Sequence, residues 1–183
     1  MAKVFKILND RQNKKMIKNS DELVKERKET IIGKEEIMFS LDVEKMITNI
    51  KRQSVLEEIE RLIDKNESIR GWKKEEILEN LKYIWDNTYC TIEDQIVNVV
   101  NGLSMESKMS PELAELIMKR WEEEKVDKVK NIRKFDRYVD DSLDIWKGKK
   151  NELKEKLKEL EDKSKGIKLK LEVEKKRKLH FWI

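Results

Sequence analysis

The stretch RYVDDSLDIW, Arg137–Trp146, places two neighbouring aspartates, Asp140 and Asp141, between two short apolar and aromatic runs. Aspartate is favoured in turns, so a tight hairpin that exposes both carboxylates to water is one interpretation. The other is that two carboxylates at a strand tip, with a third nearby, bind divalent metal ions for phosphoryl transfer. Under both interpretations the stretch predicts two strands joined at the aspartates.

A third carboxylate ends an earlier predicted strand. In EIMFSLD, Glu36–Asp42, the apolar residues Ile37, Phe39 and Leu41 alternate with the remaining positions, and a period of two is typical of a strand. Asp42 therefore lies at a strand's C-terminal end. A later alternation, IKLKLEVE over 167–174, predicts a half-exposed strand near the end of the chain.

Helical spacing and capping signals fill the remaining chain. The expected helices cover 3–18, 20–29 with Ser20 as N-cap, 54–64 opening with a capping box of Ser54 and Glu57, 75–85, 110–125 with Ser110 as N-cap and Pro111 at its first position, and 151–163 with Gly166 as stop signal. The β-branched segment 88–100 predicts an additional hairpin.

The simplified order of strand, helix, strand, strand, helix, strand predicts an α+β fold. It is a four-stranded antiparallel sheet with split βαβ, ferredoxin-like topology, backed by helices and extended by the additional hairpin. In this topology the first strand neighbours the central hairpin, so we expect Asp42 to meet Asp140 and Asp141 at one edge of the sheet.

Composition excludes several classes of site and of protein. The 183 residues suit one domain, and although 44% are charged, the formal net charge is only +4. The single cysteine, Cys90, excludes an intramolecular disulfide and a cysteine-built zinc site, and the single histidine, His180, disfavours a serine-histidine-aspartate triad. No apolar run is long enough to cross a bilayer, so we expect a soluble, intracellular protein.

In order and spacing, these motifs resemble the palm of a reverse transcriptase, of the type found in Penelope-like elements. The matching stretches are FSLDVEKMITNI at 39–50 (motif A), NGLSMESKMSPELAELIM at 101–118 (motif B), RYVDD at 137–141 (motif C), the helix Asn151–Lys163 with GIKLKLEVE (motif D) and KLHFWI at 178–183 (motif E). IKNSDELVKERKE at 17–29 resembles the stretch before motif A. The resemblance implies one palm-like domain over 1–183, with a helical lead-in over 1–35 and the motifs over 36–183.

The resemblance also implies a mechanism and partners. Two Mg²⁺ (or Mn²⁺) ions would promote transfer of a nucleotide from a dNTP to a primer 3′-OH on an RNA or DNA template. The implied metal ligands are Asp42, Asp140, Asp141 and the backbone carbonyl of Val43. The implied nucleotide and primer contacts are Ile47, Gly102, Leu103, Ser104, Tyr138 and Lys168, the last as a protonating lysine or simply a solvated strand lysine. No oligomeric state is indicated, and no membrane partner is expected.

Departures from the family pattern leave other readings open. Ile47 stands where an aromatic residue usually blocks a ribose 2′-hydroxyl, Glu106 and Lys108 replace a glycine and a proline of motif B, and Asp144 takes a commonly hydrophobic position. Segments for fingers and thumb are not visible, so we expect the isolated chain to be weak or inactive. The alternatives are a non-catalytic palm module that retains only the fold, and an RNA-binding module of RRM type that stacks bases on Phe39 and Tyr138.

Overall fold

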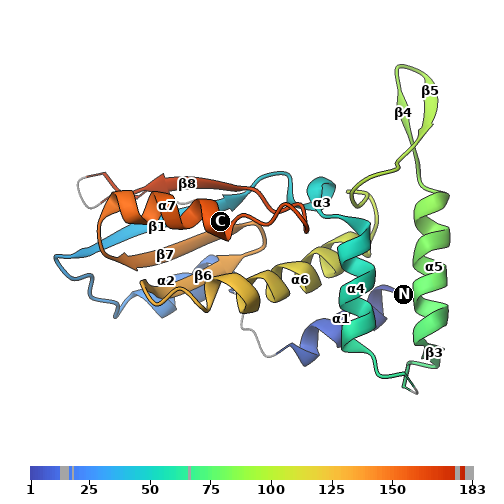
Figure 1. Ribbon diagram of the computed structural model, residues 1–183, viewed down its shortest axis with the longest axis horizontal. Coiled ribbons are helices and arrows are strands. Elements are labelled where there is room, and N and C mark those ends of the chain that lie inside the picture. The colour runs from blue at the N-terminus through green and yellow to red at the C-terminus, as the bar shows by residue number, and fades with distance from the viewer. Residues whose placement is uncertain (13–16, 18, 66, 176–177, 180–183) are drawn as a thin grey trace. The chain divides into compact units, whose positions relative to one another are not determined.

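The structure, a computed structural model, describes residues 1–12, 17, 19–65, 67–175 and 178–179 (Figure 1). Its contacts gather in two compact units. The sheet unit comprises Lys14–Glu44, Trp121–Lys163 and Ile167–Ile183, and the helical unit comprises Met1–Asn13, Lys45–Arg120 and Ser164–Gly166. The expectation of one domain over 1–183 stays a prediction.

The sheet unit contains the predicted four-stranded sheet. Its strands are β1 (Glu36–Val43), β6 (Ile132–Tyr138), β7 (Asp141–Lys147) and β8 (Leu169–Val173). They lie in the order β6-β7-β1-β8, and every neighbouring pair is antiparallel. This is the split βαβ order, because β1 lies beside the central hairpin β6–β7. The predicted fold class is therefore confirmed.

One face of the sheet carries the apolar core of this unit. Phe39 and Leu41 are fully buried on this face, and helix α7 (Lys150–Leu160) buries its leucines. The indole of Trp121 contacts the ring of Phe135 at a centroid distance of 6.1 Å and donates a 2.7 Å hydrogen bond to the carbonyl of Leu160. Because Phe39 is buried, it cannot serve as the base-stacking aromatic that the RRM reading requires.

Asp144 lies on the same core face and is fully buried, in keeping with its usually hydrophobic position. Its Oδ2 accepts a 2.6 Å hydrogen bond from the Ser142 hydroxyl, and its Oδ1 accepts one of 3.2 Å from the Asp136 amide. Burial raises the pKa of Asp144 well above its ordinary value. On the other face, Arg27 of helix α2 (Ser20–Arg27) pairs with Asp136 at 2.7 Å.

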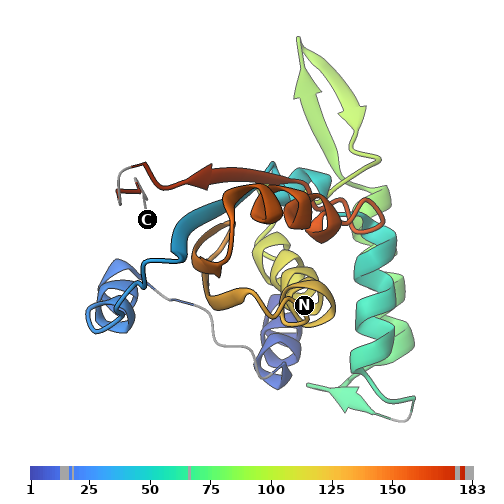
Figure 2. The ribbon, with the colours of Figure 1, turned by 60° about the vertical axis from the view of Figure 1, so that its left-hand side comes forward.

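The helical unit consists of short amphipathic helices and two small ribbons. Its elements are α1 (Ala2–Arg11), α3 (Met46–Asn49), α4 (Arg52–Leu62), β2 (Ser68–Ile69), β3 (Trp72–Lys73), α5 (Lys74–Asp86), β4 (Tyr89–Ile92), β5 (Gln95–Asn98) and α6 (Ser110–Trp121), whose last residue belongs to the sheet unit. Its core includes Phe5, Ile59, Leu81 and Leu113. The predicted additional hairpin is β4–β5, which extends beyond the end of α5 (Figure 2).

Several predicted helix boundaries are wrong. Helix α1 ends at Arg11, and residues 13–16 and 18 of the expected helix lie outside the described residues. The N-cap of α2 is Asn19 rather than Ser20, since the Asn19 side chain accepts a 2.9 Å hydrogen bond from the Glu22 amide. Helix α4 begins at Arg52, so Ser54 lies inside it.

Ser54 does not cap a helix and Gly166 does not end one. Both residues instead make contacts within the helical unit. The Ser54 hydroxyl donates to the Ser164 carbonyl at 3.1 Å. Helix α7 ends at Leu160, well before Gly166. Gly166 has a φ of +82°, and a Cβ there would lie 1.8 Å from the Asn49 carbonyl oxygen, so glycine is required for a close passage along α3.

Candidate active site

Four polar side chains form a row across the sheet. In the strand register Tyr138 of β6 pairs with Asp141 of β7, Asp141 pairs with Asp42 of β1, and Asp42 pairs with Lys170 of β8. Directly paired residues of antiparallel strands project to the same face. The structure therefore brings Asp42 beside the late acidic doublet, although the two lie far apart in the sequence.

The doublet is presented by a two-residue turn between β6 and β7. Val139 and Asp140 form this turn, and Val139 has a positive φ of +54°, which is costly for a β-branched residue. The amide of Val43, the last residue of β1, donates a 2.9 Å hydrogen bond to the Asp140 carbonyl. The turn is thus tied to the strand that carries Asp42.

Negative charge accumulates at this end of the sheet. The pKa of Asp141 is raised, first by partial burial and then by the neighbouring carboxylates of Asp140, Asp42 and Glu172. Lys170, whose ammonium lies 3.8 Å from a carboxylate oxygen of Glu172, acts in the opposite direction. A cation placed among the three aspartates would remove the repulsion that disfavours their ionised forms.

The donor chemistry fits Mg²⁺ or Mn²⁺, because these ions prefer carboxylate and carbonyl oxygens. Within the described ranges, however, no three acidic, histidine or cysteine side chains are gathered closely enough to hold a metal ion as they stand. Asp42 is paired with Asp141, and Asp140 is adjacent, so three carboxylates are available at this end of the sheet as ligands. Closure around an ion would require these side chains to turn toward one another.

The two predicted flanking residues occupy different positions relative to this row. Tyr138 is half-buried and lies in the row beside Asp141. Lys168 precedes β8 and its carbonyl accepts a 3.0 Å hydrogen bond from the Glu44 amide. The lysine that lies in the row, Lys170, was missed from the sequence. The alternation of IKLKLEVE puts Lys168 and Lys170 on one face, but only the register of β8 against β1 shows which lysine meets Asp42.

The predicted nucleotide-side residues lie in the helical unit, where a backbone hydrogen bond joins two of them. The Leu103 amide donates to the Ile47 carbonyl at 3.0 Å. Gly102 has a φ of +71°, and a Cβ there would lie 2.1 Å from the Thr48 carbonyl oxygen. Only glycine therefore permits this approach to α3. Ser104 follows, half-buried, and its carbonyl accepts a 3.2 Å hydrogen bond from the Ser107 amide.

Arg52 fixes this loop from the start of α4. Its guanidinium donates to the carbonyls of Gly102 at 2.8 Å and Val99 at 2.5 Å, and lies 5.5 Å from the ring centroid of Trp85. A hollow of about 420 Å³ opens beside it, lined by residues 48–53 and 100–102. Arg52 could not be identified from the sequence, since a lone arginine at the start of a helix gives no signal of this role.

Comparison with known proteins supports the fold. No family model and no curated protein sequence matches the chain. Among solved structures, it is similar to apo telomerase from Candida tropicalis truncated from its C-terminal domain (15% identity, TM-score 0.67, 93% of this chain and 39% of that one). It is also similar to apo telomerase from Candida tropicalis (13%, 0.68, 96% and 35%) and to telomerase from Candida albicans in complex with a TWJ fragment of telomeric RNA (13%, 0.62, 97% and 31%).

At these identities the likeness establishes the fold alone. The chain spans 31–39% of the length of these telomerase chains. Telomerase is a reverse transcriptase-related enzyme, so the neighbours carry a reverse transcriptase-like fold that agrees with the topology of the sheet unit. No helix in the described ranges combines the length and the apolar character that a bilayer crossing requires.

Proposed function

We propose that this chain is a reverse transcriptase-like palm that transfers a nucleotide from a dNTP to a primer 3′-OH. The observation that carries the proposal is the pairing of Asp42 with Asp141 at the strand ends, next to Asp140 in the connecting turn. The likeness of the fold to telomerase supports the same assignment. A hairpin that used its aspartates only as turn residues would have no need of a third carboxylate on the neighbouring strand.

The side chains of Asp42, Asp140 and Asp141, with the Val43 carbonyl, would hold two Mg²⁺ or Mn²⁺ ions. Bound there, such ions lower the pKa of an attacking hydroxyl and neutralise phosphoryl oxygens. The protein's own residues supply position. Tyr138, which is paired with Asp141 in the strand register, orients the primer end.

A lysine in the row also gives the proposal a proton donor. Lys170 is paired directly with Asp42, whereas Lys168 lies outside β8. An ammonium in this place can deliver a proton to a leaving pyrophosphate, in the manner of general acid catalysis. We therefore propose Lys170 as the acid, in place of the Lys168 that the sequence resemblance indicated.

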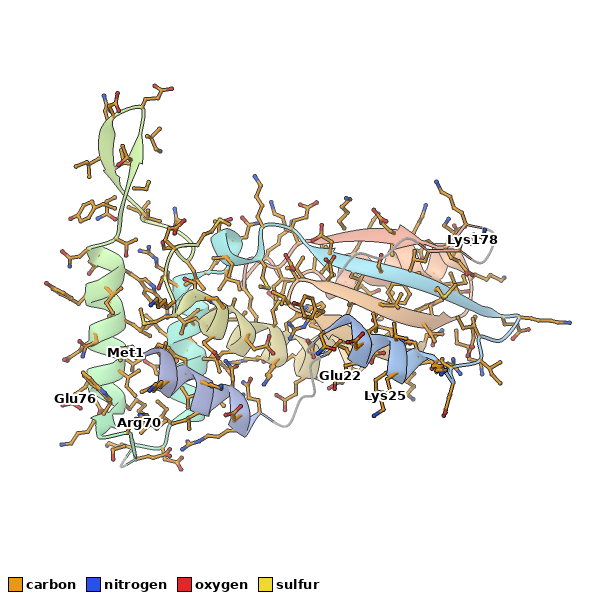
Figure 3. All side chains as sticks on the ribbon, turned by 180° about the vertical axis from the view of Figure 1, so that it is seen from behind. Met1, Glu22, Lys25, Arg70, Glu76 and Lys178 are labelled. Carbon is orange, nitrogen blue, oxygen red and sulfur yellow. The ribbon has the colours of Figure 1, made fainter. Side chains whose placement is uncertain are left out.

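A polyanionic partner is supported by a hollow of about 630 Å³ in the sheet unit. Its lining includes the lysines Lys150, Lys154, Lys175 and Lys178, the last of which lies past the end of β8 (Figure 3). In the described part of the chain, no ion pair joins these four ammonium groups to a carboxylate.

Primer extension tests the proposal. Wild-type chain is incubated with a homopolymer template, a labelled primer, the matching dNTP and Mn²⁺, and single-nucleotide addition is measured. We expect weak, single-nucleotide addition that is lost in Asp42→Ala and Asp140→Asn, and retained in Glu155→Gln, which changes an exposed carboxylate of α7. Addition that is equal in wild type and Asp42→Ala, or absent in both, would contradict catalysis by this chain.

The second candidate is a palm module that retains the fold without catalysis. It is favoured by Ile47 at the position of the usual aromatic, by the exposed Glu106 in motif B, and by the open arrangement of the carboxylates. The same assay separates the two candidates, since a non-catalytic palm gives no addition that depends on Asp42.

A further inference from the structure

We infer that Arg137 is a positioning residue that holds the turn of the acidic doublet in place from the core side of the sheet. This inference rests on the proposed function, because its consequence for activity requires that the doublet binds metal. The structural role itself is independent of catalysis.

The first observation is that Arg137 is a buried cation with a buried partner. Arg137 is 3% exposed and Glu122 is 4% exposed. The guanidinium Nε donates to the Glu122 carboxylate in a very short contact. A charge pair removed from water is costly to form and persists only where its geometry is closely satisfied.

The second observation is that another nitrogen of the guanidinium bonds the turn of the doublet. Its Nη1 donates a 2.6 Å hydrogen bond to the carbonyl of Val139. Val139 is 39% exposed, so its side chain gains little from burial, yet its backbone has the positive φ that an L-residue disfavours. Such a conformation persists when the surroundings over-determine it. The fixed fork of the guanidinium does this, by bonding Glu122 and the turn at once.

The third observation is how Glu122 reaches this place. It opens a π-helical turn, η1 (Glu122–Val126), at the end of α6, and the Asp127 amide donates to the Glu122 carbonyl at 2.9 Å. Wide turns of this kind shift the direction of side chains relative to the preceding helix and recur at functional sites. Trp121, immediately before Glu122, is fixed by its bond to the Leu160 carbonyl.

These contacts form one connected path. It runs from the π-turn through Glu122 and Arg137 to Val139, and from Asp140 to β1 through the Val43 amide. The doublet is therefore held from two sides, by Arg137 beneath the turn and by β1 beside it. Losing the Arg137 contact frees the turn to leave the conformation that presents Asp140 and Asp141 toward Asp42.

The test separates positioning from stability. The double variant Arg137→Met/Glu122→Leu removes both buried charges together and replaces them with apolar side chains, a change that buried ion pairs commonly tolerate. Its Mn²⁺ affinity is measured by electron paramagnetic resonance, beside urea unfolding. We expect affinity about 10- to 100-fold weaker, the usual effect of losing a supporting partner of metal ligands. Arg137→Lys keeps the positive charge but lacks the planar fork of the guanidinium. We expect its resistance to urea to lie closer to the wild-type value than its Mn²⁺ affinity does.

A matched control is Arg120→Met, which breaks another pair with a buried glutamate, Glu58, at 2.7 Å in the helical unit. It should lower stability and leave Mn²⁺ affinity unchanged. Wild-type affinity in a folded Arg137→Met/Glu122→Leu variant would overturn the inference.

A second readout needs no metal, so it separates failure of this inference from failure of the proposed function. Amide hydrogen exchange at Val43 reports whether the Asp140 carbonyl stays in place. We expect the double variant to lose protection at Val43 while the amide of Ile145, in the middle of β7, keeps it. Unchanged or uniformly altered exchange would overturn the positioning role, whereas a wild type that binds no Mn²⁺ would contradict the proposed function alone.

Discussion

The close approach of Gly102 to α3 gives a stability prediction that can be worked from the structure. An alanine there must adopt the positive φ of +71°, at a cost of about 1–2 kcal/mol for an L-residue. Its Cβ would lie 2.1 Å from the Thr48 carbonyl oxygen, far inside the 3.4 Å at which ordinary contact begins. Because that oxygen belongs to backbone, relief requires a shift of α3 or of the loop, and overpacking of this kind costs about 1–3 kcal/mol more.

Gly71 is a matched control in the same unit. Its φ is +83°, but a Cβ there would meet nothing within 4 Å. Gly71→Ala therefore carries the conformational cost alone, and Gly102→Ala carries that cost together with the steric one. We expect the free energy of unfolding to fall by about 1–2 kcal/mol for Gly71→Ala and by about 2–5 kcal/mol for Gly102→Ala.

Urea unfolding followed by circular dichroism measures both values, with unchanged slopes showing that the same surface is exposed. Equal losses for the two variants would refute the reasoning, because they would mean that the loop does not approach α3 as closely as described. A larger loss for Gly71→Ala would refute it more strongly.

Three further predictions follow from the sheet unit. Asp144→Asn should become more stable relative to wild type as pH rises. The raised pKa keeps the Asp144 carboxyl protonated in the folded protein, while in the unfolded protein it ionises above about pH 3.9, so the stability of the wild type falls as pH rises above that value. A difference in unfolding free energy between variant and wild type that is the same at pH 5 and pH 8 would count against this. Val139→Gly should stabilise the protein by about 1 kcal/mol, since glycine adopts the positive φ freely, and a loss of urea resistance would argue that the turn is unstrained. Lys150→Glu/Lys154→Glu should weaken binding of single-stranded nucleic acid and reduce its salt slope by up to about 1.4, and an unchanged slope in fluorescence anisotropy would remove the lysine hollow from the proposed interface.

Local patterns sufficed to predict the sheet and the position of its acidic residues. The alternation around Phe39 predicted a strand with one buried face, the alternation around Leu171 predicted a half-exposed strand, and the element order left β1 beside the central hairpin. What the sequence could not supply was register. A period of two identifies a face but not a partner, so Lys170 was indistinguishable from Lys168 until β8 was paired with β1.

Contacts between distant segments explain the other misses. Ser54 has the sequence of a cap, but its hydroxyl bonds the Ser164 carbonyl because the helix already begins at Arg52. Gly166 looks like a helix stop, yet its conformation serves the passage along Asn49. The π-turn begins at Glu122, whose side chain forms a buried pair with Arg137, and no local propensity encodes a contact between residues this far apart in the sequence.

The central claim, that Asp42 and the doublet share divalent ions, is tested most directly by Mn²⁺ titration of the isotope-labelled protein. The account predicts selective paramagnetic broadening of the amide signals of Val43, Asp140 and Asp141 at low Mn²⁺, and loss of that selectivity in Asp42→Asn. Broadening centred elsewhere, or an identical titration of the Asp42→Asn variant, would contradict it.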